Sequence, residues 1–143
     1  MRELIVLVLS AKVRLAADYQ WEPVVTEIRA SLLDNFGFQK RALGQPALLS
    51  EVIVVMQKIN GVEYVDVDVF GGVPEKKAQA DGTRELLSPE QIAKEVQQIV
   101  DRKSPAPRVD VNLADFENGA LRPAQLAIFT EAVPDTLILN QLK

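Results

Sequence analysis

The stretch INGVEYVDVDVF, residues 59–70, contains both the end of a helix and a strand with regular alternation. Gly61 is expected to end the helix, because glycine adopts a left-handed cap at little cost. Successive side chains of a strand point to opposite faces. A strand over 63–70 therefore directs one set of side chains to the core, namely Val65, Val67 and Val69. The other set lies on the opposite face, namely Tyr64, Asp66, Asp68 and Phe70.

Asp66 and Asp68 raise the question of a metal site. Two acids separated by one residue occur in some sites for hard cations, which take oxygen ligands from several segments. On a strand the same spacing puts both carboxylates on one face through the period of two alone. We favour a solvated strand face. The alternative is a small metal- or ligand-binding module that uses both acids together with Gly71 and Gly72.

One strand and two helices are predicted before this stretch. The strand covers 4–15, continuously apolar at first and alternating later. Apolar residues at helical spacing then predict a helix over 22–36, which Gly37 is placed to end. Ser50 is expected to cap a second helix, with Glu51 in its first turn.

The residues after 70 begin with a polar segment, 71–85, that is rich in Gly and Lys. We expect it to be a loop. A third helix follows with a strong local start signal, because Ser88 can cap it, Pro89 suits the first helical position and Gln91 completes a capping box.

Two further strands are predicted, at about 108–113 and at 135–142, from alternating and apolar runs. The segment 122–134 fits either an irregular extended stretch or a short helix. Together these elements predict an α+β domain, with two or three helices packed on a small, mainly antiparallel (mixed) β-sheet, ferredoxin-like in style. We expect a single domain over 1–143 with a loop-helix insertion at about 71–107.

Composition restricts the function. The 143 residues carry 16 basic and 20 acidic side chains, a net charge of −4, so no global field attracts nucleic acid. The absence of His and Cys removes the usual general base, the commonest metal ligands and the thiol nucleophile, which argues against an enzyme and against a cofactor. No run approaches the ~20 apolar residues of a membrane span, and charges at Glu3, Lys12 and Arg14 do not suit a signal peptide.

Three blocks, taken in order, carry a resemblance to a known family: VRLAADYQWEPVVTEIRASLLDNF, RALGQPALLSEVIVVMQKINGVEYVDVDVF and AVPDTLILN. This order resembles the C-terminal domain of baseplate assembly proteins of the baseplate J-like family, which occur in contractile phage tails and phage-tail-like injection systems. The middle block is the most specific, with its LGQP link and the Gly-Val turn into a valine-rich strand. The resemblance covers most of residues 5–70 and the last dozen, and is less clear over 71–107.

The resemblance implies a structural role, because family members are wedge components of the baseplate and no catalytic residues accompany the motif. It implies that the chain is the C-terminal part of a longer protein. The implied partners are other baseplate or tail proteins, further copies of the chain included, with no small-molecule substrate. The implied location is a virion or phage-tail-like particle assembled in a bacterial or archaeal cytoplasm.

For the interface, we predict apolar side chains in the stretch 121–142. They lie outside the helix and strand core predicted above, although they could equally complete that core. The residues concerned are Leu126, Ile128, Phe129, Leu137, Ile138 and Leu139.

Overall fold

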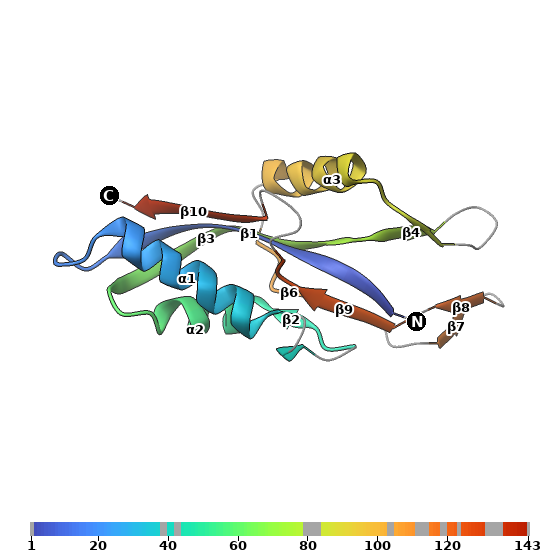
Figure 1. Ribbon diagram of the computed structural model, residues 1–143, viewed down its shortest axis with the longest axis horizontal. Helices are drawn as coiled ribbons and strands as arrows, with labels where there is room; N and C mark the ends of the chain where they lie inside the picture. Colours follow the sequence, from blue (N-terminus) through green and yellow to red (C-terminus); the bar gives the residue numbers. More distant parts are fainter. Residues whose placement is uncertain are drawn as a thin grey trace.

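Strand β1 (Arg2–Leu15) is the central strand of the computed structural model, which describes residues 2–37, 40–41, 44–78, 84–102, 105–110, 115–117, 120–122, 124–130 and 136–142. Along one edge it pairs antiparallel with β3 (Val62–Pro74). Along the other edge it pairs in parallel with β9 (Ala124–Ile128) and then with β10 (Leu137–Leu142), which lie end to end. The sheet is elongated, and β1 begins and β10 ends at opposite ends of its long axis (Figure 1).

Three helices accompany the sheet: α1 (Trp21–Asn35), α2 (Leu49–Gln57) and α3 (Pro89–Arg102). Short antiparallel pairs complete the described elements: β2 (Ala47–Leu48) with β6 (Arg108–Val109), β4 (Lys76–Ala78) with β5 (Arg84–Leu86), and β7 (Asp115–Glu117) with β8 (Ala120–Arg122). The predicted α+β class, with three helices and a mixed sheet, is confirmed.

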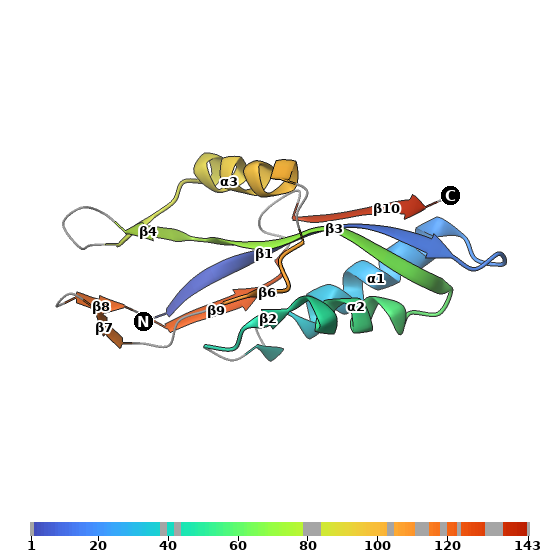
Figure 2. The same ribbon diagram turned by 180° about the vertical axis from the view of Figure 1, so that it is seen from behind.

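The helices lie on both faces of the sheet (Figures 1 and 2). Helices α1 and α2 cover one face, and α3 covers part of the other. The alternation along β1 explains this division, because its odd-numbered side chains enter the larger core and Val8 enters the smaller one. The larger core joins Leu7, Leu9 and Val13 of β1 to Val24, Ile28 and Leu32 of α1 and to Val52 and Met56 of α2. The smaller core joins Val8, Val69 and Val73 to Val96 of α3.

A β-bulge at Asp68 changes which residues of β3 face each core. Ser10 lies opposite Val69 and the next residue, Ala11, lies opposite Val67, so Asp68 has no partner in the register. An extra residue shifts the alternation of the strand by one position. Phe70 consequently enters the larger core and Val69 the smaller one.

The prediction that three valines share one face is therefore wrong. Val65 and Val67 do pack against the larger core, but Val69 points to the opposite side and packs under α3. Phe70, expected on the wet face, is 1% exposed. Strict alternation assigned Val69 and Phe70 to the wrong faces, because one inserted residue reverses the alternation of all residues that follow it.

Two predicted caps differ from the structure. Helix α2 begins at Leu49 with Leu48 as its N-cap and no side-chain cap hydrogen bond, so Ser50 lies inside the first turn. The helix ends at Gln57, and Gly61 instead forms the turn into β3 with a φ of 97°. Its carbonyl accepts a hydrogen bond from the Ala16 amide at 2.8 Å. The prediction of a left-handed conformation at Gly61 is confirmed. The residue does not cap α2, however, and instead aligns β3 beside β1.

The expected loop at 71–85 is wrong over its described part. Strand β3 continues to Pro74, where it pairs with Ile5, and β4 then pairs with β5. Residues 79–83 lie outside the described residues. The first residues of the predicted 71–107 insertion therefore belong to the central sheet.

The start of α3 confirms the predicted capping box. The Gln91 amide donates to Ser88 Oγ at 3.2 Å, and the Ser88 amide donates to Gln91 Oε1 at 2.8 Å. The sequence of the segment 122–134 was compatible with an irregular extended stretch or a short helix. In the structure the segment contains strand β9. Of the strand predicted at 108–113, residues 108 and 109 form β6, and 111–113 lie outside the described residues.

Arg41 holds the link between α1 and α2 against the sheet. Its side chain is 3% exposed. Its Nε donates to the Ala127 carbonyl at 3.2 Å, and its Nη2 donates to the carbonyls of Gln45 at 3.3 Å and Pro46 at 2.9 Å. A guanidinium has enough donors in a fixed fork to satisfy several buried carbonyls at once.

The surroundings of Arg41 balance its charge. Burial lowers the pKa of the guanidinium, and the Glu51 carboxylate, 3.9 Å from Nη1, acts in the opposite direction. The guanidinium carbon also lies 5.3 Å from the centre of the Phe36 ring, a favourable cation–π distance. Arginine remains charged at neutral pH, so the group acts as a permanent structural cation.

Replacing Arg41 is expected to destabilise the fold strongly. Arg41→Ala leaves the carbonyls of Ala127, Gln45 and Pro46 without this donor, and unsatisfied buried groups cost ~1–3 kcal/mol each. We expect a loss of about 2–4 kcal/mol in the free energy of unfolding, measured by urea denaturation.

Arg108→Ala is the matched control for this measurement. The Arg108–Asp110 pair is exposed, so its loss is expected to change stability by no more than about 0.5 kcal/mol. Equal effects of the two arginine variants would contradict the role of Arg41.

Gly72 is required by close packing, and Gly71 is not. A Cβ at Gly72 would lie 2.6 Å from Ile5 Cγ2 and 2.8 Å from Val109 Cγ1, whereas a Cβ at Gly71 would lie 3.2 Å from its nearest neighbour, Ile99 Cγ2. Gly72→Ala is therefore expected to cost about 1–3 kcal/mol through overpacking. Gly71→Ala is expected to be near neutral, because a small packing cost offsets the reduced entropy of the unfolded chain. Thermal melts of the two variants test this difference, and equal melting temperatures would refute it.

Candidate assembly surface

Part of one sheet face is left without a helix above it. On the face opposite α1 and α2, helix α3 covers Val8, Val69 and Val73, and its Ile99 lies over Gly71. Beyond α3 the same face continues over the second half of β1, the first half of β3 and β10, where no described helix covers it (Figures 1 and 2). We call this region the open half-face. By register it comprises Lys12, Arg14, Tyr64, Asp66, Ile138, Asn140 and Leu142.

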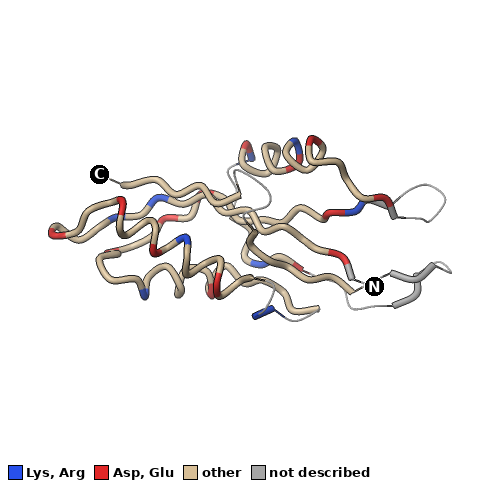
Figure 3. The backbone as a smooth tube through the Cα atoms, in the orientation of Figure 1, with Lys and Arg blue, Asp and Glu red and all other residues tan. Residues whose placement is uncertain are grey.

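The open half-face carries opposite charges in neighbouring rows. Lys12 on β1 lies opposite Asp66 on β3. Arg14 Nε lies 4.0 Å from Glu63 Oε2, and both side chains are about half exposed. Exposed pairs of this kind contribute little to folding. Figure 3 shows basic and acidic positions scattered over the rest of the tube as well. Because the charged pairs of the open half-face contribute little to folding, their side chains are available to orient a neighbouring molecule.

Apolar groups lie among these charges. Tyr64 is 43% exposed, and Ile138 and Leu142 of β10 are partly exposed. An aromatic ring with a polar tip beside aliphatic groups and charges is typical of the surfaces that proteins use to bind one another.

The residues predicted for the interface divide into two groups. Four of them are only 2–7% exposed, namely Leu126, Ile128, Phe129 and Leu139. Of these, Phe129 and Leu139 belong to the larger core. Phe129 also packs edge-on against Phe36 with ring centres 5.8 Å apart. These four have little surface to offer a partner. Leu137 and Ile138 keep partial exposure, and Ile138 belongs to the open half-face.

Asp66 and Asp68 do not form the regular pair that the sequence predicted. Asp66 is exposed and lies opposite Lys12, whereas Asp68 is the bulge residue and is half-buried. The bulge breaks the alternation on which their shared face depended. Among the described residues, no group of three or more His, Asp or Glu side chains could hold a metal ion.

Sequence reasoning missed Arg41 and Asn140. Both residues lie in blocks that carry the resemblance, but no pattern within those blocks assigns either residue a role, and the contacts of Arg41 join segments that are far apart in the chain. The alternation in AKVRLA did place Lys12 and Arg14 on the face away from Val13, and this agrees with their exposure.

Comparisons with known proteins add no relative. No protein-family model, curated protein or solved structure matches the chain. None of the described helices is both long enough and apolar enough to cross a bilayer.

A metal titration tests the alternative function. Because Asp66 is opposite Lys12 and Asp68 lies in a bulge, we expect Ca²⁺ and Mg²⁺ to give no saturable heat in calorimetry and no rise in melting temperature beyond that given by NaCl at equal ionic strength. Saturable binding that Asp66→Asn and Asp68→Asn abolish would establish the metal-binding alternative instead.

Proposed function

We propose that this chain is a structural component of a baseplate wedge, in a contractile phage tail or a phage-like injection machine, and that it acts by protein–protein assembly. The observation that carries the proposal is the open half-face, a sheet surface with interspersed charges, an exposed tyrosine and partly exposed aliphatic side chains. The proposed partners are other baseplate or tail proteins. The proposed location is the particle itself, assembled in the host cytoplasm.

The middle sequence block supports this proposal in a physical way. Its Arg41 reaches three backbone carbonyls, its Gly44 adopts a φ of 75° and donates its amide to the Gln125 carbonyl at 2.9 Å, and its Gly61 forms the turn into β3. Each of these residues maintains the backbone path. The block that resembles the baseplate J-like family therefore contains residues that stabilise the fold, and this fits a family without catalytic residues.

We further propose that the chain has no enzymatic activity. The sequence contains neither His nor Cys, so it lacks the commonest general base and the thiol nucleophile. A serine needs an adjacent base to become a nucleophile. The Ser88 hydroxyl instead accepts a hydrogen bond from the backbone amide of Gln91 at the start of α3. A small metal- or ligand-binding module at Asp66 and Asp68 is the alternative, and the calorimetric titration decides between the two.

Locating the protein in assembled particles is the direct test. Particles purified from the source cell and imaged by cryo-microscopy are expected to hold the protein in the baseplate, around the central hub. Its absence from intact particles, checked by mass spectrometry of the same sample, would end the proposal.

A charge reversal on the open half-face is expected to reduce assembly without unfolding the chain. Lys12→Glu puts an acid opposite Asp66 on an exposed surface, so the fold loses less than about 1 kcal/mol while the charge pattern offered to a partner changes sign. Incorporation into particles is expected to fall at least several-fold. Lys58→Glu is the control, because Lys58 is exposed at the end of α2, away from this face. Equal incorporation of both variants would remove the open half-face from the proposal.

A further inference from the structure

Strand β10 presents half of its backbone groups away from the sheet. Leu137 lies opposite Leu9 in the parallel register, and the Leu9 amide donates to the Thr136 carbonyl at 2.7 Å. In a parallel pair each residue bonds to the two neighbours of its partner. Residues 138, 140 and 142 consequently point their amides and carbonyls at β1, while Leu137, Leu139 and Gln141 point theirs outward.

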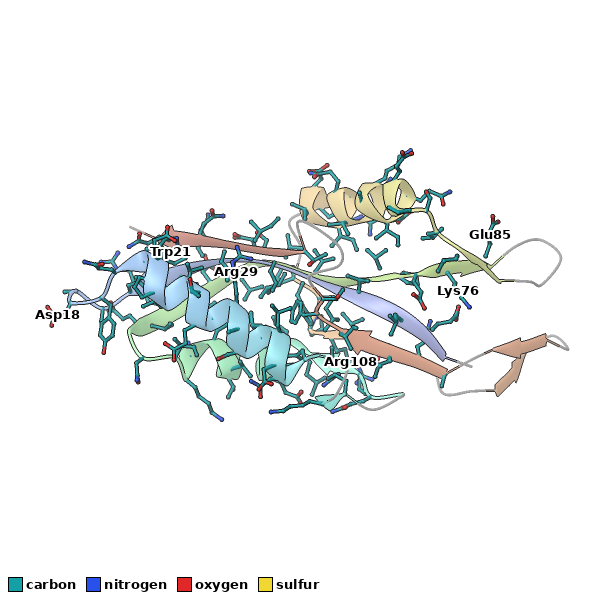
Figure 4. The ribbon with its side chains drawn as sticks, viewed as in Figure 1. Asp18, Trp21, Arg29, Lys76, Glu85 and Arg108 are labelled. Carbon is teal, nitrogen blue, oxygen red and sulfur yellow. The ribbon has the colours of Figure 1, made fainter. Side chains whose placement is uncertain are left out.

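One of these outward groups is already used. Arg29 on α1, labelled in Figure 4, donates from Nη1 to the Leu137 carbonyl at 2.9 Å. Among the described residues, no hydrogen bond reaches the outward amides and carbonyls of Leu139 and Gln141. An unpaired strand edge of this kind is a template for another strand.

The outer edge of β3 differs from that of β10. It is interrupted by the bulge at Asp68 and by a second irregularity at Glu63, and it carries acidic side chains. Bulges and charges are the usual means by which proteins prevent edge pairing. The residues of β10, LILNQL, include no charge and no proline, and their register with β1 has no shift. β10 is therefore the edge that favours pairing.

The sequence of β10 is complementary to itself about Asn140. If a second copy lies antiparallel with Asn140 opposite its own counterpart, Leu139 of each chain lies opposite Gln141 of the other. These two residues carry the outward amides and carbonyls, so each such pair exchanges two backbone hydrogen bonds. On the open half-face, Ile138 of each chain then lies opposite Leu142 of the other, which forms an apolar cross-strand pair on both sides of the axis.

We propose that β10 joins two copies of this chain, edge to edge, about a two-fold axis at Asn140. The sheet then continues through both chains in the order β3-β1-β10-β10-β1-β3, and the two open half-faces form one surface. The two Asn140 side chains are exposed in the single chain and become neighbours at the axis, where each amide donates to and accepts from the other. The inference rests on the proposed function only in that both concern assembly through protein contacts.

Complementary charges at the axis test this arrangement in the full chain. Sedimentation of the unaltered protein over a concentration series is expected to reveal a dimer. Asn140→Lys and Asn140→Glu each put like charges directly opposite one another, so each alone is expected to weaken the dimer at least about tenfold. An equal mixture of the two variants is expected to restore dimers that contain one chain of each kind. A dimer unaffected by either variant, or not restored by mixing, would overturn the proposal.

A second pair of variants separates backbone pairing from side-chain effects. Gln141→Pro removes an outward amide and leaves the bonds to β1 in place, because proline is tolerated on an edge strand when its nitrogen faces solvent. Its melting temperature at monomer concentrations is expected to remain near that of the control Gln141→Ala, while only the proline variant loses the dimer. Equal dimerisation of these two folded variants would overturn the proposal.

The outcome is independent of the particle experiment. A chain that is monomeric at all concentrations overturns the β10 pairing and leaves the baseplate proposal standing, with an unlike strand or no strand at this edge. A dimer that never enters particles has the reverse consequence.

Discussion

The pairing of β1 with three other strands is the constraint on which the rest of the structure depends. β1 uses one edge for β3 and divides the other between β9 and β10, so a single strand positions three later segments of the chain. Its first half is covered on both faces, and its second half is covered on one face only. This difference along one strand creates the open half-face, because Lys12 and Arg14 continue the row that Val8 begins under α3.

The bulge at Asp68 allows β3 to serve both sides of this sheet. Without the extra residue, Val69 would lie on the side of Val65 and Val67, and α3 would lose a main apolar contact. Phe70 would also leave the larger core, where it is among the most buried side chains. One inserted residue thus divides the apolar side chains of a single strand between two layers, which a regular strand could not do.

The sequence predicted local features well and long-range features poorly. The helix at 22–36, the capping box at Ser88 and the strand at 135–142 depend on residues close in the chain, and the structure agrees with them to within a few residues. The bulge, the contacts of Arg41 and the choice of β1 as common partner depend on residues brought together only by folding. No periodicity within a short window contains that information.

The same limit applies to the candidate surface. An apolar run such as LAIF has one composition whether it completes a core or meets a partner, so Leu126 and Phe129 could not be assigned from sequence. Leu126 is buried in β9 beside the start of β1, and Phe129 is buried where it packs against Phe36 of the segment after α1. By contrast, the exposure of Lys12 and Arg14 followed from alternation alone, because the extra residues at both register shifts, Asp68 and Glu63, lie in β3 and leave the alternation of β1 unbroken.

The placement of β1 also affects how the chain is made. Leu9 has its partner at Leu137, more than a hundred residues later, so the apolar segment of β1 leaves the ribosome long before the strands that complete its second edge. Pairing between such distant segments is slow, and an unpaired apolar strand favours aggregation. β3, the antiparallel partner, precedes β9 and β10 in the chain, so its pairing with β1 closes a shorter loop than theirs does. The spacing of the strands along the chain therefore favours pairing of β1 with β3 before pairing with β9 or β10.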